Sequence, residues 1–297
     1  MKPEEPEDTE TKPETPGETE TKPETPENPE IKPEVPENPE VPGDTETKLE
    51  TPEETETKPE ENGEKPETAE RELSKFQAMR ASAENSSINM NYGGFVFVQG
   101  VPIVIKENGG ITSIYDEAGN LLSGEGVDVS NCAIYGGGFD GDNEHTADTS
   151  ITMESGTVKA IFGGSCSGTL KGTTSIVIES GTVEAIYGGG NGSVTDGSTK
   201  IVLNGGNIGE LYGGGYAGAV MEDTSVEING GIINTSVFGG GANSAVHSGT
   251  NVKVSSGTVG LVYGGGDYGA VTGGTSVTIS GCEEITAVYG GGYCASV

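Results

Sequence analysis

An aromatic residue followed by a glycine-rich triplet recurs at a nearly fixed interval through the second half of the chain. The aromatic positions are Tyr135, Phe162, Tyr187, Tyr212, Phe238, Tyr263 and Tyr289, with spacings of 25 to 27 residues. A period in this range is typical of chains that stack one short structural unit upon the next. We therefore expect a repeat architecture over residues 135–297.

Within each repeat, one segment alternates strictly between inward and outward positions. In the last copy Thr275, Val277 and Ile279 share one face of a strand, and the corresponding threonines recur every 25 or 26 residues. A turn of small residues, a second apolar run and a third brief segment complete the unit. Three short strands in about 25 residues predict an all-β fold, a parallel β-helix (β-solenoid) of stacked coils. A prism of antiparallel strands is the alternative, whereas a propeller blade needs a longer repeat.

The first part of the chain has a different composition. Residues 1–66 hold 14 of the 15 prolines, many of them three residues apart, and decapeptides starting with Lys-Pro-Glu recur. Polyproline II has three residues per turn, and glutamates repel one another along such a rod. We predict a disordered Pro/Glu-rich stalk over 1–66, which at ~3.1 Å per residue would extend to roughly 200 Å.

Two segments connect this stalk to the repeats. Residues 67–85 show a modest amphipathic pattern and predict a short capping helix. Residues 86–134 break the period but contain strand-like runs at 95–98, 101–105 and 111–115, so we expect an N-terminal β cap that covers the solenoid edge. The final residues 290–297 stop in mid-coil, which favours a parent protein that continues beyond them.

Charge and hydropathy exclude some classes of partner. The chain has a net charge of −32, which disfavours nucleic acid and anionic membranes, since both need a basic surface. No apolar run is long enough to span a bilayer, and no signal peptide is visible. The four cysteines occupy different places in the repeat, so we expect isolated thiols rather than disulfides.

The repeat region 135–297 resembles right-handed parallel β-helices of the broad pectin-lyase-like class. The whole chain resembles bacterial surface proteins that carry Gly-rich β-solenoids behind Pro/Glu-rich, wall-spanning stalks. This resemblance implies a secreted protein, located outside the cell or in the bacterial cell wall, and it implies the right-handed coil. It rests on the form of the repeat and on composition, because no catalytic motif of a family supports it.

The residue pattern of the repeats argues against the chemistry of β-helix enzymes that cleave polysaccharides. A lyase needs a strong base, yet the repeats contain no arginine and their lysines lie at unrelated positions. A glycoside hydrolase needs grouped carboxylates, but the outward strand positions contain only Glu227, with Lys253 expected beside it as a surface ion pair. We therefore expect no enzymatic activity from these coils.

Two further candidate sites remain. Asp140, Asp142 and Glu144 alternate in a glycine-containing loop, a pattern that Ca²⁺ prefers, although a solvated turn is the plainer interpretation and no other cofactor is implied. The aromatic ladder from Tyr135 to Tyr289 could offer a flat apolar strip to sugar rings. It could equally be a structural ladder, because the alternation pattern leaves open whether its rings face inward or outward.

The sequence thus favours a non-enzymatic extracellular or cell-surface β-solenoid, adhesin-like or structural, that an acidic stalk projects. Its partners would be glycans or surface proteins of a host or bacterium. The alternative is a polysaccharide-active β-helix enzyme, a lyase or glycoside hydrolase, whose active coils lie outside this chain.

Overall fold

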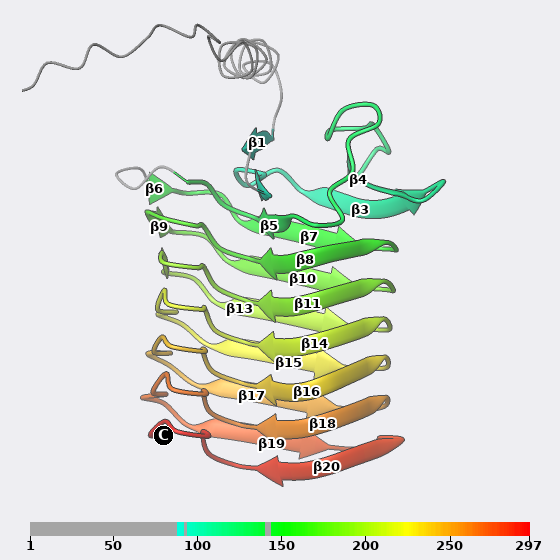
Figure 1. The fold of residues 1–297 in the computed structure, drawn as a ribbon. Coiled ribbons are helices and arrows are strands. Elements are labelled where there is room, and N and C mark those ends of the chain that lie inside the picture. Colours follow the sequence, from blue (N-terminus) through cyan, green and yellow to red (C-terminus); the bar gives the residue numbers. More distant parts are fainter. Residues whose placement is uncertain (1–87, 92–93, 140–143) are drawn as a thin grey trace, which may run out of the picture. The chain divides into compact units, whose positions relative to one another are not determined.

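The repeats form a parallel β-solenoid of about six coils, as predicted (Figure 1). In a computed structural model of the chain, the described residues are 88–91, 94–139 and 144–297, and no helix occurs among them. The predicted stalk at 1–66 and the predicted helix at 67–85 lie outside the described residues. Each coil contributes one strand to each of two large sheets and a short third segment.

Three sheets run along the solenoid and are called sheets A, B and C below. Sheet A has the order β1 (Asn89–Asn91), β2 (Phe95–Phe97), β5 (Ala133–Tyr135), β8 (Thr157–Phe162), β11 (Thr182–Tyr187), β14 (Asn207–Tyr212), β16 (Ile232–Phe238), β18 (Thr258–Tyr263) and β20 (Glu284–Tyr289). Sheet B has the order β19 (Thr275–Ile279), β17 (Thr250–Val254), β15 (Thr224–Ile228), β13 (Thr199–Leu203), β10 (Thr174–Ile178), β7 (Thr149–Met153), β3 (Ile103–Asn108) and β4 (Ile111–Asp116). Sheet C consists of β12 (Val194–Thr195), β9 (Thr169–Leu170) and β6 (Glu144–His145), and single bridges through Val220, Val246 and Val271 continue it.

Identical positions of successive coils lie directly over one another. In sheet B, for example, Thr174 pairs with Thr199 and Ile176 pairs with Ile201. Sheet A follows the same rule except near β16, where the pairing shifts between Ile208 and Leu211. A bulge there accommodates the extra residue of a 26-residue interval, so the irregular spacing in the sequence has a local structural cause.

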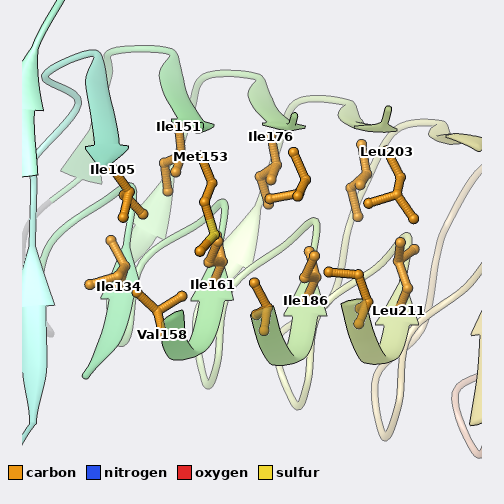
Figure 2. Close-up of a cluster of buried hydrophobic side chains, with 14 of the residues drawn as sticks. Ile105, Ile134, Ile151, Met153, Val158, Ile161, Ile176, Ile186, Leu203 and Leu211 are labelled. Atoms are coloured by element: carbon orange, nitrogen blue, oxygen red, sulfur yellow. The ribbon is translucent and has the colours of Figure 1, made fainter. Parts of the chain in front are cut away.

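Aliphatic side chains of sheets A and B face one another across the interior. Figure 2 shows this arrangement, with Ile151, Met153 and Ile176 opposite Ile161 and Ile186. These side chains are almost completely inaccessible to solvent. Burying each one stabilises the fold by about 1.5–3 kcal/mol, which makes this continuous apolar core the main source of stability.

A hydrogen bond between a threonine and a glycine fixes one corner of every coil. In the six sheet B strands that start with threonine, that residue donates its Oγ1 proton to the carbonyl oxygen of the first glycine after the ring, over 2.5 to 2.7 Å. The inward direction predicted for these threonines is confirmed, because Thr149 to Thr250 are buried. Glycine is required at this corner for space: a Cβ on Gly188 would lie 2.1 Å from the Gly213 oxygen of the next coil.

Antiparallel pairs occupy the N-terminal edges of the two large sheets. Strand β1 pairs antiparallel with β2, and β3 and β4 form a hairpin whose turn contains Gly109 and Gly110 at positive φ. Strand β2 also pairs parallel with β5, and β3 pairs parallel with β7, so both join the coils directly. The strand-like runs expected at 95–98, 101–105 and 111–115 correspond to β2, β3 and β4 within two residues at their starts.

Candidate functional site

The seven predicted aromatic positions form a single column, called the ring stack below. From Tyr135 to Tyr289, successive ring centroids are 4.6 to 5.0 Å apart and their planes differ by only 4° to 10°. This spacing is the separation of neighbouring strands, about 4.7–4.9 Å, so in-register pairing by itself brings the rings face to face.

The rings lie outside the aliphatic core between sheets A and B but are nevertheless buried. The aliphatic residue before each ring, such as Ile186, packs into the interior between sheets A and B, whereas Tyr187 belongs to a second apolar cluster with Ala160 and Ala185. Residues of the corner segment that follows the glycine triplet cover this cluster; Tyr216, for instance, meets Tyr187 edge-on at 5.6 Å. From Tyr135 to Tyr263 no ring is more than 9% exposed, while Tyr289 in the last coil is 47% exposed.

This packing limits how the ring stack could contact a ligand. Because each ring covers the face of the next, a sugar could reach only ring edges between Tyr135 and Tyr263. The packing supports the structural interpretation of the ladder, and a direct ligand role for its rings stays a prediction.

The hydroxyl groups of two ring-stack tyrosines form hydrogen bonds with neighbouring side chains. Asn191 Nδ2 donates to the Tyr135 oxygen over 3.1 Å, and the Tyr212 hydroxyl donates to Glu210 Oε2 over 3.0 Å. Burial raises the pKa of Tyr135 and of Tyr187 to about 12, and burial together with the negative charge of Glu210 raises the pKa of Tyr212 further. These phenols therefore stay protonated at neutral pH and act as hydrogen-bonding groups.

A groove of about 490 Å³ runs beside the N-terminal half of the ring stack, and it is a candidate site among the described residues. Its floor consists of Ala133, Ala160 and Ala185 together with ring edges. Lys159 and Glu184 line it from the sheet A strands, and Asn191 and Tyr216 line it from the corner segment. The groove is therefore built by successive rungs of sheet A, from β2 to the segment that follows β14.

Small residues at one register position create this groove. In sheet A, Phe95, Ala133, Ala160, Ala185 and Glu210 pair successively across neighbouring strands. Alanine leaves room above the sheet on three rungs, whereas a phenylalanine and a glutamate occupy the same position on the rungs before and after. Sequence reasoning missed the groove, although these alanines, two residues before each ring, were the available signal.

The predicted calcium loop is only partly described. Asp140 and Asp142 lie outside the described residues. Glu144 is exposed at the start of sheet C, and its carboxylate lies 3.4 Å from Lys171 Nζ, which also pairs with Asp196 at 2.8 Å. Within the described ranges no group of three or more His, Cys, Asp or Glu side chains could hold a metal ion, so the calcium site remains an untested prediction.

Two features of the charged side chains on the coils were not predicted from the sequence: the ion-pair partner of Glu227 and the effect of Glu210 on Asp267. Glu227 forms its ion pair with Lys200, at 3.1 Å, instead of the expected Lys253, although Glu227 and Lys253 are paired register neighbours. In addition, burial, and then the negative charge of Glu210, raise the pKa of Asp267. Asp267 follows a ring by four residues, in the column that covers the ring stack, so counting outward strand positions could not find this pair.

The cysteine thiols are unpaired, as expected. Cys132, Cys166, Cys282 and Cys294 are all free. Burial raises the pKa of Cys166, and burial followed by the charge of Asp128 raises that of Cys132, so both thiols are less reactive than exposed ones. Their surroundings fit a packing role.

Comparisons with known proteins provide no family assignment. The chain matches no protein-family model, no curated protein and no solved structure. In the part of the chain that the structure describes, no helix has the length and apolarity needed to cross a membrane. Functional inference therefore rests on the residues themselves.

Proposed function

We propose that this chain is a non-enzymatic extracellular or cell-surface β-solenoid, adhesin-like or structural, which residues 1–66 project as an acidic stalk. The observation that carries the proposal is the unbroken series of stacked coils. The same threonine–glycine hydrogen bond recurs from Thr149 to Thr275, and the ring stack runs beside it without a gap. Six rungs at about 4.8 Å make a rod roughly 30 Å long.

Several features support this role. A solenoid whose coils contact only their neighbours can present the same surface positions repeatedly along its length. The net charge of −32 of the whole chain favours solubility and disfavours adsorption to polyanions. The groove beside the ring stack is open to solvent, and its charged groups, Lys159 and Glu184, come from different coils. These properties suit contact with a surface better than turnover of a substrate.

One observation favours a second function. Glu210 and Asp267 are close enough to affect one another electrostatically, and the Tyr212 hydroxyl is hydrogen-bonded to Glu210. Glycoside hydrolases use two carboxyl groups, one of which has a raised pKa. A polysaccharide-active β-helix is accordingly the alternative, and this pair would be its first candidate within the described coils.

Two measurements test the proposal on the full chain. Protease treatment of intact cells of the source organism should remove the protein, and a purely intracellular location would overturn the surface assignment. Incubation with a panel of neutral and uronic acid polysaccharides should release no reducing ends and no unsaturated products. Cleavage by the wild-type chain that disappears in Glu210→Gln or Asp267→Asn would refute the non-enzymatic assignment and establish the alternative.

A further inference from the structure

We propose that the groove beside the ring stack binds a segment of an uncharged glycan. The inference rests on the proposed surface role, and it names the class of ligand. The alanine floor and the ring edges supply an apolar surface across three rungs, while polar side chains stand along its rim. A mostly apolar hollow with a few convergent polar groups is the usual form of a small-molecule site.

The two exposed aromatic residues of the groove match the chemistry of a sugar ring. Phe95 at one end is 41% exposed and Tyr216 beside the other is 42% exposed, in contrast to the buried ring stack. A pyranose has an apolar C–H face and a rim of hydroxyl groups. An aromatic side chain provides large, rigid apolar area for such a face, and the hydroxyl of a tyrosine can also hydrogen-bond.

Side-chain amides of the groove match the hydroxyl rim. Asn131 and Asn191 both line it, and an amide offers two donors and an acceptor, as hydroxyl groups require. One amide proton of Asn191 is already donated to Tyr135, which holds the side chain in a defined orientation. A held amide loses less conformational freedom when a ligand binds.

The charges of the groove favour an uncharged ligand. Lys159 and Glu184 occupy the same place in successive coils, so the groove has one charge of each sign in a chain of net charge −32. The field of the whole chain repels polyanions such as uronic acid polymers. A basic peptide would be attracted, but the groove offers it a single carboxylate, accompanied by a lysine. An uncharged glycan meets neither obstacle.

Groove-filling variants test the proposal without removing any hydrogen bond. Ala160→Leu and Ala185→Leu should fit, because Leu261 occupies the same register position three coils beyond Ala185. Ala217→Leu is the matched control, since Ala217 is exposed and lies outside the groove. Tyr216→Ala is a second variant, which removes an exposed ring instead of filling space. Circular dichroism and thermal melting should show that all four variants fold.

The measurement is titration of the full chain with short neutral oligosaccharides, with uronic acid and sulfated oligosaccharides, and with a lysine-rich peptide. We expect the neutral class to bind with little dependence on salt. Each groove variant should weaken that binding at least about tenfold, equivalent to about 1.4 kcal/mol, while Ala217→Leu leaves it unchanged. Failure of every neutral oligosaccharide to bind, undiminished binding by the folded groove variants, or preference for a charged ligand would each overturn the proposal. None of these results bears on cell-surface location or on turnover, so the proposed function is tested separately.

Discussion

Replacing Thr199 by valine should destabilise the solenoid although the two side chains have nearly the same shape. Thr199 is 2% exposed, and its hydroxyl donates to the Gly213 carbonyl oxygen over 2.6 Å. Valine fills the same space, so no cavity forms, but the corner carbonyl loses this donor. Leaving a buried polar group without its partner costs about 1–3 kcal/mol.

The expected effect is large enough to measure by thermal melting. For a domain of about 150–250 residues, 1 kcal/mol shifts the Tm by roughly 2–4 °C, so Thr199→Val should lower it by roughly 2–12 °C. Because a solenoid is stabilised coil by coil, hydrogen exchange should accelerate most in β13, β14 and the adjoining coils.

A matched control separates the lost hydrogen bond from a general effect of valine. Thr152 lies on the outward face of β7, and Val177 occupies the paired position in the next coil. Thr152→Val should therefore change stability by no more than about 0.5 kcal/mol. Equal Tm shifts for Thr199→Val and Thr152→Val would refute the role assigned to the threonine–glycine hydrogen bond.

Four other predictions follow from the packing and the hydrogen bonds of the coils. Gly188→Ala should sharply reduce the Tm, because the new Cβ would clash with the backbone of the next coil. Gly290→Ala should be tolerated, because no heavy atom lies within 4 Å of the Cβ that it would add. Equal Tm shifts for the two variants would contradict this prediction. Phe238→Ala should lower the free energy of unfolding, measured by chemical denaturation, by about 3–5 kcal/mol, whereas Phe238→Tyr should change it little. A small effect of Phe238→Ala would mean that the ring stack contributes little to stability. Burial and then the charge of Glu210 raise the pKa of Asp267 in the folded state. Ionisation of Asp267 therefore destabilises the fold as pH rises from its unfolded-state pKa through its folded-state pKa. Asp267→Asn should raise the Tm at pH 7, and this increase in Tm should disappear in acid. Hydrogen bonds from the Ser248 hydroxyl and a backbone amide lower the pKa of Asp223. Asp223→Asn should therefore lower the Tm at pH 7, and the difference in Tm from the wild type should vanish as pH falls through the folded-state pKa. A Tm shift in the same direction for the Asp267 and Asp223 variants would refute these explanations.

Much of the fold could be predicted because its signals are local. Strict alternation at Thr275, Val277 and Ile279 requires only the two-residue period of a strand, and the recurrence of this pattern requires only that like units stack. The runs that form β3 and β4 were also predicted as strands, since Asn108 and two glycines separate them, but their antiparallel pairing was not. The segments at 1–66 and 67–85, and the pair Asp140 and Asp142, lie outside the described residues, so those predictions stand untested.

The candidate site was less accessible to sequence reasoning, because its residues are brought together from different coils. The groove depends on Phe95, on alanines of three strands and on Tyr216 from a corner segment. Glu210 on β14 and Asp267 after β18 are separated by the coil of β16, and the ion pair of Glu227 was assigned to Lys253 instead of Lys200. Long side chains can reach diagonally across a sheet, so adjacency of rungs does not determine which charges pair.

The sequence by itself determined the repeat, the inward threonine and aliphatic positions, and the need for glycine at the corner. Tertiary structure alone decided the direction and burial of the rings. A ring at the end of a strand follows an inward residue, so alternation turns it away from the core only if no bend begins there, and the path of the next segment determines whether water or protein covers it. Here the corner segment folds over the rings, and the resulting stack supports the wall of an open groove.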